Sequence, residues 1–221
     1  MKAVIFDMDG VIFDSERIWQ ESYILANKKF NLNLDEKFRQ KTCGMNEKDT
    51  RKLLNKLFPD LNIDEYRNYM QVFFETYIKK NGAPIKQGFL ELINFLKTKN
   101  CKIGLATGNE RQFVEIMFNS VNLDLYSLFN FVVAGEEVKK GKPDPEIYLK
   151  IVNGLNVNAQ DCFVLEDSIN GIKSAKTAGC NPIMVIDLIK PNKYVKQNAF
   201  NICSNLIEAK DIISKIFKNS H

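Results

Sequence analysis

The chain has 221 residues, of which 45% are hydrophobic and 26% are charged, and its 31 basic and 27 acidic residues give a formal net charge of +4. This composition predicts a soluble globular protein with at least one substantial core and excludes an intrinsically disordered chain. Because the lysines are scattered and no apolar stretch approaches the ~20 residues of a membrane span, we expect neither a nucleic acid nor a membrane as a partner.

The first predicted strand covers residues 3–6, and Asp7 and Asp9 follow at its end. Open parallel sheets bind ligands at the carboxyl ends of their strands, and an extended chain would point both carboxylates to the same side, about 6 to 7 Å apart. Gly10 would let the backbone turn closely around a bound group. An Asp-Gly turn is also common in any protein, so this segment alone leaves both interpretations open.

Residues 16–83 contain no convincing strand, and aromatic residues recur at helical spacing near both ends of this interval. An insertion of this length after the first strand predicts a helical-bundle cap domain over the mouth of the sheet. Ser15 is a candidate N-cap for its first helix. The expected domains are therefore an α/β core, residues 1–15 and 84–221, and a cap, residues 16–83.

Short apolar runs and helical patterns alternate through the rest of the chain, which predicts an α/β fold with a Rossmann-like, doubly wound parallel sheet. The further strands are expected at residues 103–106, 131–134, 162–165 and 182–186, and a closing helix at 207–217.

Polar segments follow three of these strands as well. Thr107-Gly108-Asn109 offers a hydroxyl and backbone N–H groups suited to phosphate oxygens, Lys142 offers a positive charge in a proline-fixed loop, and Glu166-Asp167 adds two acids. A capped helix, a solvated lysine and an acidic helix start would each explain one of them alone. Four such features at consecutive strand ends indicate one shared site.

Cysteine and histidine usage limits the possible chemistry. The five cysteines are odd in number and lack CxxC spacing, which favours reduced, mostly buried thiols over disulfides or a zinc site. The single histidine, His221, is the last residue, so a catalytic triad is excluded and a working acid or base would be a carboxylate or lysine. The apolar run at the N-terminus ends at Asp7, too early for a signal peptide, and we expect a cytoplasmic monomer.

The segments DMDGV, LATGN, KGKPDPEIY and VLEDSINGI, in this order, resemble the motifs of the haloacid dehalogenase superfamily of phosphotransferases, in the branch with a helical cap after the first strand. The resemblance covers essentially the whole chain. It implies that Asp7 is a nucleophile that becomes an aspartyl phosphate and that Asp9 is the general acid and base. It also implies a phosphate-binding set formed by Thr107, Gly108, Asn109 and Lys142. The implied Mg2+ site is formed by Asp7, the Asp9 backbone carbonyl, Asp167 and Glu166.

Electrostatics supports these implied roles. A phosphomonoester dianion repels a carboxylate nucleophile, so attack by Asp7 requires a cation between them, and Mg2+ prefers hard oxygen ligands. Dehalogenases and phosphonatases of the superfamily lack an aspartate at the position of Asp9, which disfavours those activities here. Relatives often carry Ser or Asn where this chain has Gly108, so a backbone N–H would have to serve at that point.

The segment DSERIW, with Glu16 and Trp19, resembles sugar-phosphate phosphatases of the 2-deoxyglucose-6-phosphatase type. Beta-phosphoglucomutases carry a histidine in place of Trp19 and a phosphate-clamping arginine in place of Glu47, and an acid there would repel a second phosphate. We therefore expect a cap that lacks the positive charge a mutase needs. Packing within the cap explains Trp19 equally well.

The expected function is Mg2+-dependent hydrolysis of a small phosphorylated metabolite, in particular a sugar phosphate, with a beta-phosphoglucomutase-type phosphotransferase as the alternative. A protein that only binds a phosphorylated ligand, or one that serves in protein interaction, would need no nucleophile. The intact set of Asp7, Asp9, Lys142 and Asp167 disfavours both.

Overall fold

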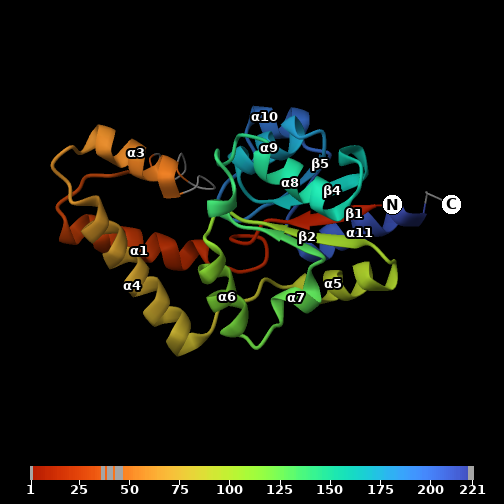
Figure 1. Ribbon diagram of the computed structural model, residues 1–221, viewed down its shortest axis with the longest axis horizontal. Helices are drawn as coiled ribbons and strands as arrows, with labels where there is room; N and C mark the ends of the chain where they lie inside the picture. Colours follow the sequence, from red (N-terminus) through yellow and green to blue (C-terminus); the bar gives the residue numbers. More distant parts are fainter. Residues whose placement is uncertain (1, 36–37, 39–41, 43–46, 219–221) are drawn as a thin grey trace.

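A six-stranded parallel sheet, in the order β3-β2-β1-β4-β5-β6, forms the centre of the molecule in this computed structural model, which describes residues 2–35, 38, 42 and 47–218 (Figure 1). The strands are β1 (Ala3–Phe6), β2 (Lys102–Ala106), β3 (Phe131–Val133), β4 (Cys162–Glu166), β5 (Asn181–Val185) and β6 (Asn201–Cys203). The first five confirm the predicted strands. The sequence did not reveal β6, because this edge strand has three residues and only one of them is buried.

The two faces of the sheet pack into separate cores, as a doubly wound fold requires. Val4 and Phe6 of β1 point into the core with α5, α6 and α11, whereas Ala3 and Ile5 point into the core with α8 and α9. The helices of the sheet domain are α5 (Phe89–Thr98), α6 (Arg111–Asn119), α7 (Leu125–Leu128), α8 (Glu146–Leu155), α9 (Ile169–Thr177), α10 (Lys193–Asn198) and α11 (Leu206–Lys218). The last of these confirms the predicted closing helix.

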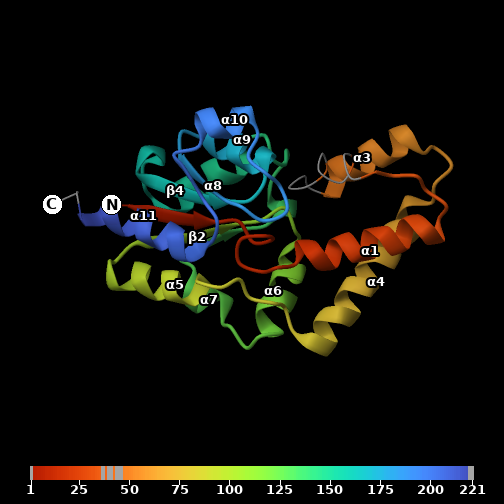
Figure 2. The same cartoon turned by 180° about the vertical axis from the view of Figure 1, so that it is seen from behind.

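A helical insertion separates β1 from β2. Figures 1 and 2 show α1 (Glu16–Lys29), α3 (Glu47–Leu57) and α4 (Ile63–Asn81) set beyond the edge at which β1 ends. These helices share a small core of their own, in which Ala26, Leu54 and Tyr66 are buried. In the part of this interval that the structure describes there is no strand, as predicted.

The register of the sheet fixes where the loops meet. Phe6, the last residue of β1, lies opposite Leu105 of β2 and Leu165 of β4. The three strands therefore end almost level, and the segments that follow them converge at one edge, below the inserted helices.

Two other predictions concern residues away from this edge. Four of the cysteines, Cys101, Cys162, Cys180 and Cys203, are buried free thiols, as expected. Cys43 and His221 lie outside the described residues. Among the helices that the structure describes, not one is both long and apolar enough to cross a membrane.

Candidate active site at the carboxyl edge of the sheet

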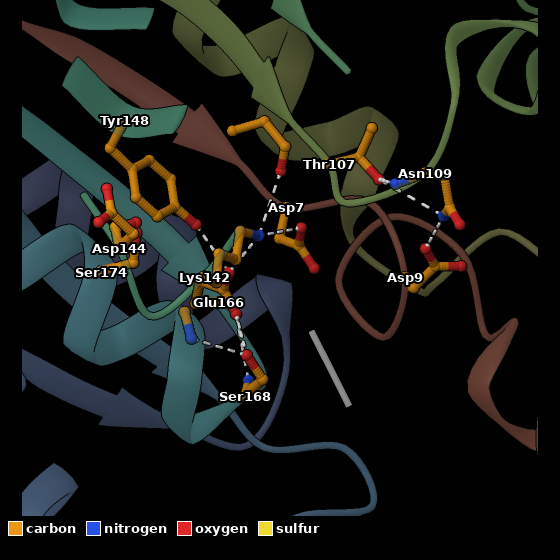
Figure 3. A network of polar contacts seen from close by, with 12 residues as sticks. Asp7, Asp9, Thr107, Asn109, Lys142, Asp144, Tyr148, Glu166, Ser168 and Ser174 are labelled. Atoms are coloured by element: carbon orange, nitrogen blue, oxygen red, sulfur yellow. Dashed lines mark hydrogen bonds and ion pairs between the residues drawn. The ribbon is translucent and has the colours of Figure 1, made fainter. Parts of the chain in front are cut away.

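A buried lysine holds two of the acids together (Figure 3). The Lys142 ammonium donates to Asp7 Oδ1 and to Glu166 Oε1, each at 2.6 Å, and lies 3.4 Å from the carbonyl oxygen of Ala106. Burial alone would lower the pKa of Lys142, but its two ion pairs raise it above the ordinary value. Lys142 is thus a permanent positive charge inside the site, and not the solvated loop lysine that the alternative interpretation required.

Glu166 is saturated with hydrogen bonds. Besides Lys142, its Oε1 accepts from the Tyr148 hydroxyl at 2.7 Å, and its Oε2 accepts from the Ser168 backbone N–H and hydroxyl at 3.1 and 3.0 Å. Helix α9 begins directly against this carboxylate, and a Cβ at Gly171 would come within 1.8 Å of it. Because every Glu166 oxygen already has donors, this residue fits the positioning of Lys142 better than direct metal ligation.

Sequence reasoning missed Tyr148 and this second function of Ser168. Ser168 also caps α9, since its Oγ accepts from the Gly171 N–H at 2.9 Å. Tyr148 stands six residues after Lys142 within the segment KGKPDPEIY, and that fixed position was the available signal. The same loop is held from α9, where Ser174 Oγ donates to the Asp144 carbonyl at 2.6 Å (Figure 3).

The acids Asp7, Glu166 and Asp167 form a buried cluster in the place where a metal site was expected. Their carboxylate oxygens all lie within 4.8 Å of one another. Burial raises the pKa of Asp7 and of Asp167 well above the ordinary value of 3.8, and neighbouring acids add to this, although Lys142 opposes it at Asp7. Three carboxylates against one ammonium leave an excess of two negative charges, which is the charge and the ligand chemistry that a hard divalent cation fits.

Gly10 makes this arrangement possible. Its φ of +73° is in the left-handed region, and a Cβ there would come 2.3 Å from the Asp167 carboxylate. The close turn expected after Asp9 is therefore present, and its purpose is to bring the β1 loop against the β4 acids.

Asp9 faces the same cavity but has different partners. The Ser15 hydroxyl donates to its Oδ1 and the Asn109 amide donates to its Oδ2. Burial raises the pKa of Asp9, and these two hydrogen bonds oppose that shift. Ser15 does precede α1, but its side chain makes no capping hydrogen bond, so that prediction is wrong; the hydroxyl is engaged by Asp9 instead.

The Thr107-Gly108-Asn109 segment forms a tight turn beside Lys142. Thr107 is buried, and its Oγ1 accepts from the Asn109 N–H at 3.2 Å. Gly135 supports the turn from outside, because its N–H donates to the Asn109 carbonyl at 2.7 Å and a Cβ would come 2.0 Å from the Gly108 oxygen. Helix α6 begins only at Arg111, so the turn precedes the helix rather than starting it.

A cavity of about 170 Å³ joins this edge to the inserted helices. Of the cap residues predicted from the sequence, Glu16 and Trp19 line it, whereas the side chain of Glu47, the first residue of α3, lies outside the described part of the structure. Trp19 also stacks on Phe74 at 4.1 Å between ring centroids, so it combines cap packing with cavity lining. Further lining residues that sequence reasoning did not identify are Tyr23, Thr50, Tyr66, Arg67 and Met70.

The expected lack of the positive charge that a mutase needs stays a prediction, but the cap does bring one cationic side chain to the cavity. Arg67 of α4 is half-buried and lines the cavity, and it also borders the crevice that Gly108 and Asn109 face. The resemblance to mutases placed the expected cation at position 47, whereas Arg67 reaches the cavity from α4. Helical spacing alone could not reveal this, because it does not fix how α4 is rotated over the sheet.

Asp7 and Asp9 after β1, the buried Lys142 and Asp167 after β4 all line one cavity of a doubly wound sheet, and Glu166 at the end of β4 holds the lysine. This arrangement defines a hydrolase of the phosphoryl-transfer class. The family described as haloacid dehalogenase-like hydrolase matches residues 4–185, and the chain belongs to this family. The resemblance drawn from the four motifs is therefore confirmed.

Individual relatives refine the comparison. Over 186 residues, 83% of this chain and 84% of the relative, the sequence is 35% identical to the phosphorylated carbohydrates phosphatase of Thermotoga maritima. It is 30% identical to (DL)-glycerol-3-phosphatase 2 of Arabidopsis thaliana over 196 residues, 83% of this chain and 79% of that one. The crystal structure of beta-phosphoglucomutase from Clostridium difficile matches with a TM-score of 0.81 at 23% identity, over 99% of this chain and 98% of that chain, which shows a common fold.

Proposed function

We propose that this phosphatase of the haloacid dehalogenase-like family hydrolyses a small phosphorylated carbohydrate through a phosphorylated Asp7. The observation that carries the proposal is the placement of Asp7. It is buried, paired with Lys142, and exposed to the cavity that the cap covers. Lys142 donates to this carboxylate, yet burial and the neighbouring acids still raise the pKa of Asp7, which fits a site that takes up further positive charge.

Asp7 and Asp9 are suited to different steps because their surroundings differ. Asp7 attacks phosphorus while Lys142 neutralises charge on the phosphoryl oxygens. Asp9 is held by Ser15 and Asn109, away from Lys142, so it can donate a proton to the leaving oxygen and later accept one from the attacking water. The turn at Thr107 and Gly108 offers a hydroxyl and backbone N–H groups to the phosphate.

The cofactor we propose is Mg2+, held by Asp7, Asp167 and the backbone carbonyl of Asp9, with Glu166 supporting the site through Lys142. When bound, the ion offsets the repulsion between the Asp7 carboxylate and the phosphate. The excess of two negative charges in the acidic group supports this proposal.

The cap wall supports a sugar or polyol phosphate as the substrate. Thr50, Glu16 and Arg67 line this wall with polar side chains, and Trp19 offers an aromatic face. The Tyr23 and Tyr66 hydroxyls donate within the cap, to the Asp35 carbonyl and to Asn27 Oδ1, and their oxygens can still accept from substrate hydroxyls. The cavity is smaller than the roughly 300–1,000 Å³ typical of sites for drug-sized ligands, which suits a small metabolite. The named substrates of two relatives, phosphorylated carbohydrates and glycerol 3-phosphate, belong to this class.

A mutase is the second candidate, and Arg67 is the observation that favours it. A cationic side chain on the cap, facing the cavity from the side of Asn109, is able to hold the second phosphate of a bisphosphate intermediate. We place the phosphatase first because Glu16 brings a negative charge to the same cavity. We also propose residues 1–15 and 84–221 as the catalytic domain and residues 16–83 as the cap.

Phosphate release measured with Mg2+ across sugar phosphates, polyol phosphates and nucleotides tests the proposal. We expect the highest kcat/KM among hexose or smaller sugar phosphates, and release from an aryl phosphate that stops when EDTA is added. Failure both to release phosphate from any ester and to interconvert sugar phosphates would leave only a binding protein. Conversion of beta-glucose 1-phosphate to glucose 6-phosphate faster than phosphate release, in a coupled assay primed with the bisphosphate, would instead select the mutase.

A further inference from the structure

Two chain segments connect the sheet to the inserted helices, and they are paired with each other. The first linker is residues 12–15 and the second linker is residues 82–87. The Lys86 N–H donates to the Ile12 carbonyl and the Asp14 N–H donates to the Pro84 carbonyl, both at 2.8 Å, and Phe13 and Ile85 form an antiparallel bridge between them. Because these bonds cross-link the linkers, any movement of the cap relative to the sheet moves both linkers together.

Lys86 ties this pair of linkers to the core. Its ammonium lies 2.7 Å from Asp187 Oδ1, and the Asp187 side chain is only 2% exposed. Asp187 stands two residues beyond the end of β5, next to the β4 edge that carries Glu166 and Asp167. The pair differs from a surface ion pair because the Asp187 carboxylate is buried, whereas Lys86 is 20% exposed. Without Lys86, the Asp187 charge would be desolvated without compensation.

Asp14 is the third charged group at this point. Its Oδ2 pairs with the exposed Arg17 at 3.2 Å, while its Oδ1 is buried and lies 4.0 Å from the Lys86 ammonium. Within the described part of the chain, neither Asp14 Oδ1 nor Asp187 Oδ2 has a hydrogen-bond donor. One ammonium with three N–H donors therefore stands between two carboxylates that each keep an unsatisfied oxygen. A small shift of the first linker would bring Asp14 into contact with Lys86.

The first linker leads directly into the candidate active site. The residue after Asp14 is Ser15, whose hydroxyl donates to Asp9, and the next is Glu16, which lines the cavity. The position of the first linker thus affects both the partner of the proposed acid and the wall that would contact the substrate.

We propose that Lys86, Asp187 and Asp14 form an electrostatic clamp that sets how the cap sits on the sheet, with Lys86 as a positioning residue for cap closure over the substrate. This inference rests on the proposed function only because the kinetic test detects cap closure through the hydrolysis of a phosphoester. Its geometry does not involve the proposed nucleophile. Lys86 touches no reacting group, and it acts through the linkers.

The test compares the wild type with K86M, K86R and the double variant K86M/D187N. The double variant is needed because K86M alone leaves Asp187 buried without a partner, whereas the pair of substitutions removes both charges. In the double variant we expect KM for glucose 6-phosphate or glycerol 3-phosphate, whichever the wild type hydrolyses faster, to rise about 10-fold. With an aryl phosphate too small to need the cap, kcat of the double variant should stay within about twofold of the wild-type value. K86R keeps the positive charge and should therefore retain most of the wild-type affinity for the sugar or polyol phosphate.

Two further measurements separate positioning from folding and from the proposed function. R17M breaks the exposed pair on the other oxygen of Asp14 and should leave all parameters within about twofold. Amide hydrogen exchange at residues 12–15 and 82–87 should become faster in the double variant and not in R17M, and this readout requires no activity. If the wild type hydrolyses no phosphoester, the proposed function fails while the exchange measurement still decides the clamp. A folded double variant with unchanged KM and unchanged linker exchange would overturn the clamp.

Discussion

The cavity has a floor, formed by the strand-end residues Asp7, Asp9, Lys142 and Asp167, and a wall, formed by cap residues such as Trp19 and Arg67. The floor and the wall are built differently. On the floor, charged side chains from strands that end level with one another are in direct contact, as with Lys142 between Asp7 and Glu166. The wall is a helix surface, where Trp19 packs on Phe74 and also faces the cavity. We therefore propose that the floor determines the reaction and that the wall determines which leaving group is accepted. Substitutions on the floor should lower turnover of every ester, whereas those on the wall should change the ranking of esters.

The largest effect is expected for Asp7→Asn. The amide lacks the anionic nucleophile, so phosphate release from sugar and aryl phosphates should fall at least about 10³-fold. Removing one negative charge from a crowded acidic group should not reduce thermal stability. Turnover and the melting curve should be measured on the same preparation, and a variant that keeps more than a small fraction of activity would remove Asp7 from its role.

Asp9→Asn should lower turnover less, by about 10²- to 10⁴-fold, because it removes general acid-base assistance and leaves the nucleophile in place. Dephosphorylation of Asp7 should slow more than phosphorylation, so phosphoenzyme should accumulate. Rapid-quench sampling measures both steps. The substitution should affect sugar and aryl phosphates alike, and a loss confined to sugar phosphates would mean that Asp9 belongs functionally to the wall.

The acids of the floor also predict a coupled dependence on pH and Mg2+. The folded-state pKa values of Asp7 and Asp167 lie above 3.8, so the metal-free folded protein binds more protons than the unfolded chain between 3.8 and those raised values. The free energy of unfolding from this source therefore falls as pH rises across that window. Mg2+ binds the ionised carboxylates, so its stabilisation should grow with pH.

At 100-fold excess over its dissociation constant, Mg2+ should add about 2.7 kcal/mol of stability, a shift in Tm of roughly 5 to 10 °C. Thermal melts at several pH values with Mg2+ or EDTA measure this. Asp167→Asn should abolish most of the shift, while Glu75→Gln, at an exposed position of α4, serves as the control and should retain it. A shift that persists in Asp167→Asn would place the cation elsewhere.

Arg67→Gln should have the smallest effect and should distinguish the wall from the floor. We expect KM for the preferred sugar phosphate to rise about 10-fold, because a lost charge-assisted hydrogen bond costs about 1.5 to 3 kcal/mol. The rise in KM for an aryl phosphate should be several-fold smaller than the rise for the sugar phosphate. Steady-state kinetics on the two esters measures the ratio. Equal losses on both would show that Arg67 contacts the transferred phosphate rather than the leaving group.

The difference between floor and wall also explains what the sequence could predict. Strand ends are marked by apolar runs followed by polar residues, so the amino-acid pattern alone assigns Asp7, Lys142 and Asp167 to one edge of the sheet. Contacts between distant segments were not predictable in this way. The bond from Ser15 to Asp9 replaced a predicted helix cap, and the bond from Tyr148 to Glu166 joins α8 to β4. Arg67 was missed because a helical pattern does not specify the rotation of α4 about its axis.

Trapping the covalent intermediate tests the central claim most directly. The protein is mixed with Mg2+ and a sugar phosphate labelled in its phosphoryl group, quenched in acid within milliseconds, and digested for peptide mapping by mass spectrometry. We predict one acid-stable, hydroxylamine-sensitive phosphoryl group on Asp7, absent in Asp7→Asn and longer-lived in Asp9→Asn. Steady phosphate release with no label on Asp7 at any time, or a label on another residue, would contradict the account.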